Sequence, residues 1–358
     1  MLFICIIIIT ITLLLLFNYN DEGFLGDSGE TIFVSVPSYR DTDCKNTLKS
    51  IYKMARFPHL VYVGVFEQND GTCPEESCRI RSPYSGNIRY KYISYKQAKG
   101  PFYARAVINN NLYRGEKYYL MIDAHSLFLK DWDINMKKQL NFLRKHGVTK
   151  PIISSYPHHQ DFNESREIIN KKKNVTTLIC DVINGKQYPT EAVAIEKQSG
   201  KFYKSMLLGA GFLFTYGEFF REIRMDESLH HIFSGEEILL AIFAWTHGWD
   251  IYSPSYMNLF HYYNHKKPSW YKDVIKKDEN SRNSEIKAYQ KLSNIIDTAS
   301  VNDGMGKVRS VESFWKKLGF FRDGATIKEK YPKSSKLNNC DNSPTINYPF
   351  REDFIGTF

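Results

Sequence analysis

The stretch Tyr118-Tyr119-Leu120-Met121-Ile122-Asp123-Ala124-His125 decides the fold and carries the most specific chemical pattern in the chain. Its first five residues are apolar or aromatic, which predicts a buried strand, and a carboxylate and an imidazole follow at its end. Asp123 and His125 are two residues apart, so an extended backbone projects both side chains to one side. Such a pair can hold a divalent ion such as Mn²⁺. The alternative, Asp123 as a turn cap beside an unrelated histidine, is disfavoured by the apolar strand before it.

Segments on both sides of this strand alternate between strand and helix patterns. Apolar runs predict strands over residues 31–36, 60–66, 117–122, 209–216 and 250–253, with a polar turn over 37–43. Helical spacing predicts helices over residues 44–55, 102–112, 132–146 and 236–247. Short buried strands separated by helices predict an α/β, Rossmann-like fold with a mainly parallel central sheet. Ligands are then expected at the carboxyl ends of the strands.

A third metal ligand is expected among the downstream histidines, and His261 is the best placed of them. It ends the apolar stretch 256–260, where a half-buried imidazole could face the cleft. His230 and His231 sit in a polar turn, and His247 suits a helix C-terminus. Alternatively, His261 is a buried core histidine whose ring nitrogens are hydrogen-bonded within the protein.

Two further motifs offer carboxylates and a close backbone approach. In Ser234-Gly235-Glu236-Glu237, Ser234 as N-cap with Glu237 three residues later matches a capping box, which leaves Glu236 as the freer carboxylate for ligand hydroxyls. A solvated helix start is the alternative for Glu236. Gly209-Ala210-Gly211 before an apolar strand predicts close approach of the backbone to a ligand, or a tight turn.

Near the first strand, Ser38-Tyr39-Arg40-Asp41 supplies an aromatic face, a fork donor and a carboxylate where a nucleotide base and ribose could dock. The alternative is an ordinary cap, because Asp41 or Asp43 would start the next helix well. Arg105 lies early in its predicted helix. It could meet a diphosphate there or belong to a solvated face.

The amino terminus predicts a membrane anchor. Residues 2–17 carry no charge and would span about 24 Å as a helix, against a hydrocarbon core of roughly 30 Å. No small-residue cleavage site follows, so we expect an uncleaved anchor over residues 1–20, a short stem over 21–30 and a lumenal remainder. Sequons at Asn163 and Asn174 agree weakly with that topology.

Composition limits the classes of protein to which the chain can belong. The 358 residues are 42% hydrophobic, which excludes a disordered chain, and a net charge of +9 favours an anionic ligand. The basic residues are scattered and form no nucleic-acid-binding pattern, so no nucleic-acid partner is expected. Cys73 and Cys78 could form a loop-closing bridge, whereas a zinc site is not expected without a second cysteine pair. Residues 31–265 form the expected catalytic domain, with an insertion or lid over 156–190, and 266–358 a basic helical region and tail.

Taken in order, the strings at residues 34–41, 121–125, 209–212 and 234–237 resemble the polypeptide (hydroxyproline or threonine) α-N-acetylglucosaminyltransferases. The resemblance covers about residues 31–265 and implies a GT-A fold, a UDP-GlcNAc donor, a divalent metal and retention at the anomeric carbon. The chain is more distantly similar to the mucin-type polypeptide GalNAc-transferases, which share an Asp-x-His metal motif and a downstream histidine. Asp123 and His125 match that motif, and His261 the downstream ligand.

The resemblance implies transfer of N-acetylglucosamine to a Thr, Ser or hydroxyproline hydroxyl of a protein acceptor. Some relatives are cytosolic enzymes that modify hydroxyproline, whereas a hydrophobic start resembles the Golgi-type members that modify Thr. A single-pass membrane protein facing the Golgi or ER lumen is therefore expected. Three alternatives stay open: another donor such as UDP-GalNAc, a membrane-anchored binding module with a degenerate site, and a metal-dependent hydrolase using the same Asp and His.

Overall fold

The computed structural model describes residues 29–159, 174–184, 189–223, 225–263, 268–323, 326–329 and 345–348. The chain divides into two units, Met1–Glu30 and Thr31–Phe358, and every described helix and strand belongs to the second. The predicted anchor and Asn163 lie outside the described residues. Within the described part of the chain, no helix is both long and apolar enough to cross a bilayer.

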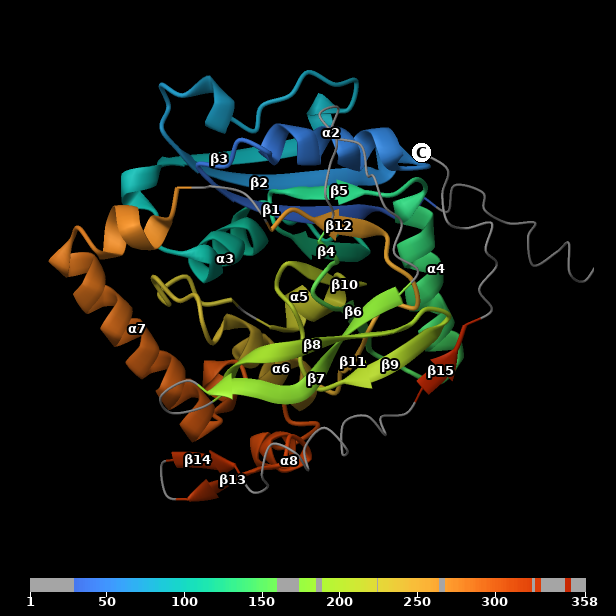
Figure 1. Ribbon diagram of the computed structural model, residues 1–358, viewed down its shortest axis with the longest axis vertical. Helices are drawn as coiled ribbons and strands as arrows, with labels where there is room; N and C mark the ends of the chain where they lie inside the picture. The colour runs from blue at the N-terminus through green and yellow to red at the C-terminus, as the bar shows by residue number, and fades with distance from the viewer. Residues whose placement is uncertain are drawn as a thin grey trace, which may run out of the picture. The chain divides into compact units, whose positions relative to one another are not determined.

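A nine-stranded sheet forms the centre of the described fold, in the order β15-β9-β11-β6-β10-β4-β1-β2-β3 (Figure 1). Its strands are β1 (Ile32–Tyr39), β2 (Val61–Asn69), β3 (Ile88–Ser94), β4 (Tyr118–Ile122), β6 (Pro151–Ser154), β9 (Lys201–Ser205), β10 (Phe212–Tyr216), β11 (Asp250–Tyr252) and β15 (Thr345–Asn347). Among these described strands, seven run in one direction, and β9 and β10 run in the other. The expected mainly parallel sheet is confirmed.

The strand β4 lies between β1 and β10, and all five of its residues are buried. It pairs in parallel with β1, so the two strands end at the same edge of the sheet. The ring of Phe33 in β1 packs 5.2 Å from the ring of Tyr119 and 5.4 Å from that of Tyr113, centroid to centroid. This apolar contact fixes the position of β4, and the residues after Ile122 therefore reach the edge where ligands bind in α/β folds.

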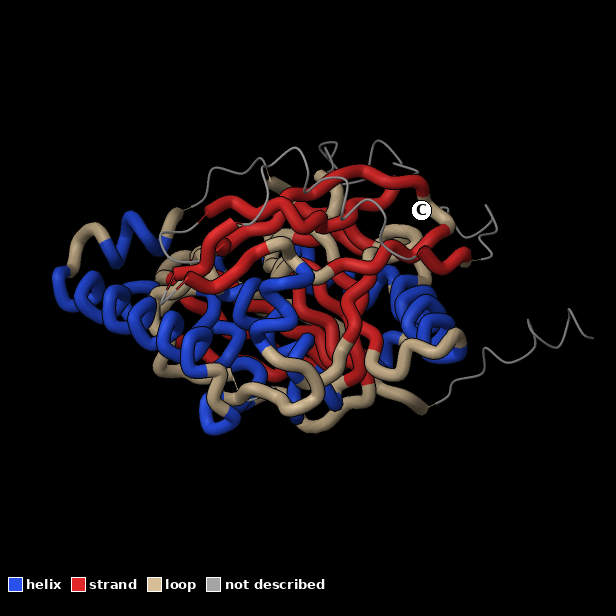
Figure 2. Tube along the Cα trace, turned by 90° about the horizontal axis from the view of Figure 1, so that it is seen from below, coloured by secondary structure: helices blue, strands red, loops and turns tan. Residues whose placement is uncertain are grey.

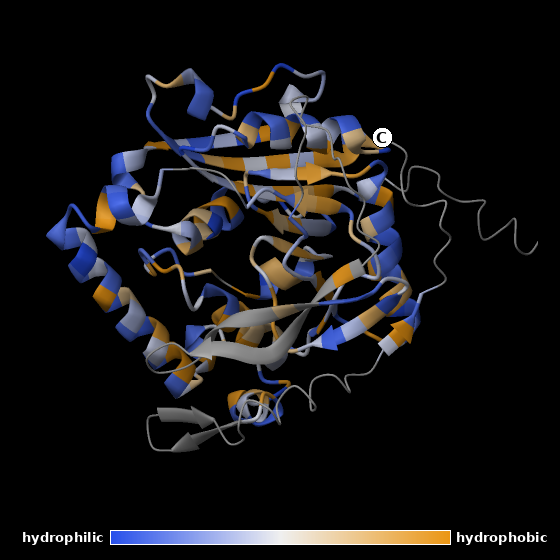
Figure 3. Cartoon of the chain, viewed as in Figure 1, coloured by the Kyte–Doolittle hydropathy of each residue, from blue (hydrophilic) through white to orange (hydrophobic). Residues whose placement is uncertain are grey.

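The described α-helices are α2 (Cys44–Met54), α3 (Pro101–Asn111), α4 (Trp132–Lys145), α5 (Glu218–Glu222), α6 (Glu236–Thr246), α7 (Glu279–Thr298) and α8 (Val311–Lys317). Short turns of 3-10 helix occupy Pro58–Leu60, Pro74–Glu76, Ser85–Asn87, Tyr95–Gln97 and Val301–Asp303, and a π-helical turn, η5, occupies Tyr271–Ile275. Figures 1 and 2 both show α7 at the periphery of the strands. Figure 3 shows hydrophobic residues concentrated in the central strands and mixed hydropathy along α7.

Among the described residues, three antiparallel pairs lie outside the large sheet: β5 (Ser126–Phe128) with β12 (Leu259–His261), β7 (Asn174–Asn184) with β8 (Pro189–Gln198), and β13 (Phe320–Asp323) with β14 (Thr326–Glu329). The first pair positions the site, because its register places His261 opposite Ser126. A histidine far along the sequence is thereby held beside the residues that follow β4.

Several expected elements differ from those observed. β1 continues to Tyr39, through residues expected to form a polar turn, because β2 pairs with it along its whole length. The strands β3 and β6 were not predicted, and part of the expected 156–190 lid forms the β7–β8 hairpin. The C-terminal part contains strands β13 to β15 besides the expected helices. The proposed domain boundary at 265 stays a prediction.

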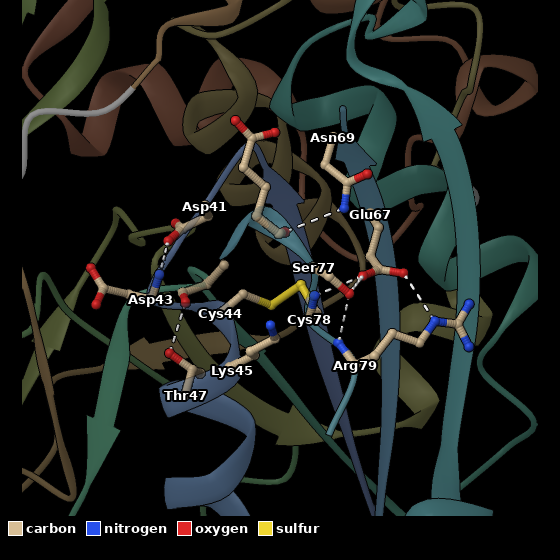
Figure 4. The surroundings of a disulfide bond; sticks show 12 residues. Asp41, Asp43, Cys44, Lys45, Thr47, Glu67, Asn69, Ser77, Cys78 and Arg79 are labelled. Carbon is tan, nitrogen blue, oxygen red and sulfur yellow. Dashed lines mark hydrogen bonds and ion pairs between the residues drawn. A yellow bond between two sulfur atoms is a disulfide. The ribbon is translucent and has the colours of Figure 1, made fainter. Parts of the chain in front are cut away.

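The disulfide joins Cys44 to Cys78, which corrects the expected bridge between Cys73 and Cys78 (Figure 4). Cys44 begins α2, and the segment after β2 brings Cys78 to a Cα distance of 5.1 Å, within the range that a disulfide needs. The backbone N–H of Cys78 donates to Glu67 Oε1 at 2.7 Å, which holds that segment against the strand. Cys73 remains a free thiol.

Candidate active site

Asp123, His125 and His261 converge at the carboxyl end of β4. One ligand atom from each residue lies within 4.8 Å of the others. Asp123 Oδ2 is 3.1 Å from His261 Nε2, and the two imidazole rings are 4.3 Å apart between centroids. His125 lies in a turn rather than in extended backbone, so the turn, and not strand alternation, brings it beside Asp123. One carboxylate and two imidazoles are a donor set that suits a divalent transition metal.

Asp41 orients His125. Its Oδ2 is 2.8 Å from His125 Nδ1, and its Oδ1 accepts from the backbone N–H of Asp43 at 2.8 Å. Asp41 is buried, with an exposed fraction of 3%. A carboxylate on Nδ1 directs Nε2 of the imidazole towards a metal, as second-layer carboxylates do in many metal sites. Asp41 thus orients one of the candidate metal ligands and also lines the cleft.

Arg105 bridges two carboxylates. Its Nη2 donates to Asp123 Oδ1 and its Nη1 to Glu236 Oε2, each at 2.7 Å. Arg105 is 5% exposed, and its ion pair with Glu236 is buried on both sides, whereas the Asp123 side chain is 28% exposed. Burial by itself raises the pKa of the Asp123 carboxyl, but the hydrogen bond from His261 and the charge of Arg105 outweigh it and hold that pKa well below its usual value. Asp123 is therefore a carboxylate at neutral pH.

Of the two glutamates of α6, Glu237 does not have the expected role of a helix cap. The N-cap is Gly235, with φ of +102° and no side-chain cap hydrogen bond, so the predicted capping box is wrong. Glu237 instead accepts from the backbone N–H of Ala210 at 2.8 Å and from Tyr156 Oη at 2.5 Å. Glu236 is held by Arg105. Gly235 adopts a left-handed conformation, and α6 begins at the next residue, Glu236. Both glutamate side chains therefore point into the protein.

Both carboxyls have raised pKa values. Burial raises the pKa of Glu236 to about 6 against the lowering effect of Arg105, and burial raises that of Glu237 to about 7 against its hydrogen bonds with Tyr156 and Ala210. Glu236 Oε1 has no hydrogen-bond partner among the described residues although it is buried. A buried, unpaired carboxylate oxygen is costly unless a ligand group donates to it.

The backbone of Gly209-Ala210-Gly211 makes a close approach, as predicted, but it approaches the side chains of Asp123 and Tyr156 rather than a ligand. A Cβ at Gly211 would lie 2.9 Å from Asp123 Oδ2, and one at Gly209 would lie 2.8 Å from the ring of Tyr156. Both distances are shorter than real Cβ contacts. Glycine is required at both positions because the segment leading into β10 packs directly against Asp123 and Tyr156.

A cleft of about 410 Å³ opens beside the cluster, a size typical of small-molecule sites. Of the predicted residues, Tyr39, Asp41, Arg105, Asp123 and His125 line it. Eight predicted residues are not among its described lining residues: Ser38, Arg40, Gly209, Ala210, Gly211, Glu236, Glu237 and His261. Arg40 instead pairs with Glu76 at 3.0 Å and Asp273 at 3.2 Å.

Sequence reasoning missed Tyr156, Tyr263, Trp270 and Asp273. Tyr156 holds Glu237, and Asp273 in η5 accepts from Tyr39 Oη at 3.0 Å. Tyr263 and Trp270 line the cleft, and the ring of Tyr263 lies 4.0 Å from that of His261. None of them stands in a local motif, so only the tertiary contacts reveal their place.

An α/β sheet with an Asp-x-His pair at the end of a central strand and a cleft beside it is the arrangement that the resemblance to GT-A glycosyltransferases implies. The chain belongs to the Glycosyltransferase (GlcNAc) family, whose model matches residues 31–85 and 72–321. The sequence-based resemblance is confirmed at this level. No curated protein sequence matches the chain significantly.

Among solved structures, the chain is similar to the "Crystal structure of GalNAc-T7 with UDP, GalNAc and Mn2+". The TM-score is 0.52 at 12% sequence identity, and the similarity covers 81% of this chain. It covers 57% of the GalNAc-T7 chain, so this protein corresponds to little more than half of that one. At such low identity the likeness shows the fold, which confirms the predicted GT-A architecture.

Proposed function

We propose that the protein transfers N-acetylglucosamine from UDP-GlcNAc to a hydroxyl of a protein acceptor, with a divalent ion such as Mn²⁺ held by Asp123, His125 and His261. The convergence of these three side chains at the end of β4, in a member of the Glycosyltransferase (GlcNAc) family, carries the proposal. The structurally similar GalNAc-T7 was crystallised with UDP, GalNAc and Mn²⁺, which supports a UDP-sugar donor and a divalent metal. A divalent ion in this place would neutralise the charge of a departing diphosphate.

The other site residues bind and orient. Arg105 holds Asp123 and Glu236 in place, and Asp41 holds His125. Glu236 Oε1, buried and without a partner among the described residues, is a suitable acceptor for a sugar or acceptor hydroxyl. Tyr39 and the other cleft residues offer a surface for the nucleoside.

A donor panel tests this proposal. The full chain is incubated with UDP-GlcNAc, UDP-GalNAc or UDP-glucose, with Mn²⁺ or with EDTA, and UDP release is measured. We expect hydrolysis to be fastest with UDP-GlcNAc and abolished by EDTA. Asp123→Asn should lower the rate by about a hundredfold or more, whereas Glu312→Gln, an exposed control, should not. Preference for UDP-GalNAc would favour the alternative donor, and an EDTA-insensitive rate would contradict the metal site.

Retention of the anomeric configuration is part of the proposal. An inverting enzyme needs a carboxylate placed to deprotonate the acceptor, whereas Glu236 is held by Arg105 and Glu237 by Ala210 and Tyr156. A retaining route lets a diphosphate oxygen take the acceptor proton on the face from which it leaves. Glu236→Gln should then impair binding moderately, rather than remove about two to four decades of rate. The anomeric coupling constant of the first product, measured by NMR, must show an α-linkage.

We also propose that residues 1–20 anchor the protein in a membrane, with residues 31–358 in the ER or Golgi lumen. The Cys44–Cys78 disulfide supports this topology, because disulfides persist in oxidising compartments. Expression in a secretory eukaryotic cell should give a glycosidase-sensitive mass shift that disappears in the Asn163→Gln/Asn174→Gln variant. A soluble, unglycosylated product would contradict the topology.

A further inference from the structure

A second cavity, which we call the acidic groove, lies between α3, α5, α6 and α7. Its volume is about 720 Å³, larger than the 410 Å³ cleft beside Asp123. None of the candidate metal or nucleotide residues lines it among the described residues, so the proposed transfer reaction does not account for it.

The floor of the acidic groove is apolar. Phe102 of α3, Leu239 and Phe243 of α6 and Ile295 of α7 line it, and each is at most 3% exposed. Val301 stands at its rim with 51% of its surface exposed. Because the floor side chains are almost fully buried, Val301 at the rim offers a ligand most of the apolar contact.

Several carboxylates also line the groove, and they differ in whether a lysine pairs with them. Glu222 pairs with Lys150 at 2.6 Å, and Asp226 pairs with Lys291 at 2.5 Å. Glu227 has only neutral donors among its described hydrogen-bond partners, the side-chain amides of Asn110 and Asn111 at 3.1 and 3.2 Å.

Asp303 accepts from the hydroxyl of Thr298 at 3.4 Å, which is also a neutral donor. Two negative charges, those of Glu227 and Asp303, therefore face the groove without a described cationic partner. The protein as a whole carries a formal charge of +9, so this acidity is local. A local negative potential above an apolar floor attracts a ligand that is both basic and apolar.

We propose that the acidic groove docks a basic, apolar-containing segment of the polypeptide acceptor. The proposal rests on the proposed function for the identity of this partner. Two helices connect the groove with the catalytic cleft: α3 presents Phe102 to the groove and Arg105 to the cleft, and α6 carries Leu239 in the groove and Glu236 beside Arg105. An acceptor segment in the groove thus lies against the elements that hold the transfer site.

The test uses the full chain and two fluorescein-labelled peptides, Lys-Leu-Thr-Lys-Val-Lys and Glu-Leu-Thr-Glu-Val-Glu. Fluorescence anisotropy measures binding without donor or metal. We expect the lysine peptide to bind and the glutamate peptide not to bind. Binding should weaken when salt is raised from about 50 to about 200 mM, because added ions screen exposed charges. Equal binding of both peptides, or binding of neither, overturns the proposal.

Two variants locate the binding. Glu227→Gln/Asp303→Asn removes both charges and keeps the accepting oxygens, and it should weaken binding of the lysine peptide about tenfold. Val301→Ser should weaken it less, through the loss of apolar contact. The control Glu312→Gln/Glu279→Gln removes two exposed carboxylates elsewhere and should leave binding unchanged. A groove variant that binds like the wild type overturns the proposal.

Transfer to the peptide separates this proposal from the proposed function. In the Glu227→Gln/Asp303→Asn variant, KM for the lysine peptide should rise about tenfold, while hydrolysis of UDP-GlcNAc without acceptor stays unchanged. If UDP-GlcNAc is not consumed at all, the proposed function fails while anisotropy still reports on the groove. If the variant loses concentration-dependent self-association instead of peptide binding, the occupant is a second copy and the acceptor proposal is overturned.

Discussion

The catalytic cleft and the acidic groove are both lined by α3, and α6 lines the groove while its Glu236 pairs with Arg105 of the cleft, but the carboxylates of the two regions have different partners. In the cleft, Asp123 contacts Arg105 and His261, and Glu236 contacts Arg105. In the acidic groove, Glu227 and Asp303 have neutral donors as their described partners. The charge-paired carboxylates of the cleft, buried Glu236 and half-buried Asp123, belong to a preorganised site. Those of the groove are available to an external partner.

This difference predicts that removing a charge lowers the free energy of unfolding strongly in the cleft and hardly at all in the groove. A buried ion pair that loses one member leaves the other charge uncompensated in a region of low dielectric. When a groove carboxylate is replaced by the corresponding amide, the charge is lost, but the amide oxygen can still accept the same hydrogen bond. The predictions below use stability, metal affinity and pH dependence to separate the two cases.

The largest effect is expected for Arg105→Gln. This variant leaves Asp123 and Glu236 facing each other without their shared cation, and it should lower the free energy of unfolding by about 3–5 kcal/mol. Thermal unfolding of the full chain measures the loss. Arg79→Gln is the matched control, because Arg79 is paired with Glu67 at 3.5 Å but its side chain is 62% exposed, so it should lose less than about 1 kcal/mol.

The double variant Arg105→Gln/Glu236→Gln sharpens this prediction. Removing the Glu236 charge together with that of Arg105 should recover part of the lost stability, because the two side chains are coupled through their ion pair. If the double variant is as unstable as the sum of the single variants, the pair is not coupled. The account of Arg105 as the bridge in the cleft is then wrong.

The sequence predicted the centre of this site because its residues stand in local patterns. The apolar run before Asp123 indicates a buried strand, and strands of a parallel sheet end at a common edge, so the place of Asp123 follows from topology. His125 was expected beside it through strand alternation, but a turn brings it there instead. His261 could be selected because it ends an apolar stretch. Its pairing with β5 is a long-range contact that the sequence does not contain.

The arrangement around this centre could not be predicted from the sequence. Ser234 and Glu237 have the spacing of a capping box, but Gly235 adopts a left-handed conformation and Glu237 finds a stronger partner in the backbone of Ala210. The partner of Cys78 is decided by the approach of α2, 34 residues away in the sequence. Local spacing carries no information about either tertiary contact.

A smaller effect is expected for Asp41→Asn, measured as affinity for Mn²⁺ by calorimetry. The carboxylate of Asp41 contacts both the backbone N–H of Asp43 and His125 Nδ1. An asparagine has one accepting oxygen and cannot accept from both, so His125 should lose its orientation. We expect Mn²⁺ affinity to fall about ten- to a hundredfold. Asp70→Asn, outside the cleft, is the control, and unchanged affinity in Asp41→Asn would show that Asp41 does not orient the ligand.

The pH dependence of the free energy of unfolding tests the raised pKa of the buried Glu237. Burial raises its pKa to about 7 in the folded chain from an ordinary value near 4.5, so folding takes up a proton between these pH values. The stability due to this uptake is full below about pH 4.5 and is lost as the pH rises through 7. Glu237→Gln should therefore be more stable relative to the wild type at pH 8 than at pH 5, by about 1–3 kcal/mol. A pH-independent difference between the two proteins would contradict the buried titration.

The smallest effect is expected for Glu227→Gln/Asp303→Asn in the acidic groove. The amide oxygens can still accept from Asn110, Asn111 and Thr298, and the loss of two negative charges removes repulsion rather than an ion pair. We expect the free energy of unfolding to stay within about 0.5 kcal/mol of the wild type. Thermal unfolding beside Arg105→Gln, at low and at high salt, gives the comparison. A loss above about 2 kcal/mol would mean that the groove carboxylates hold the fold together as those of the cleft do, and the contrast between the two regions would then fail.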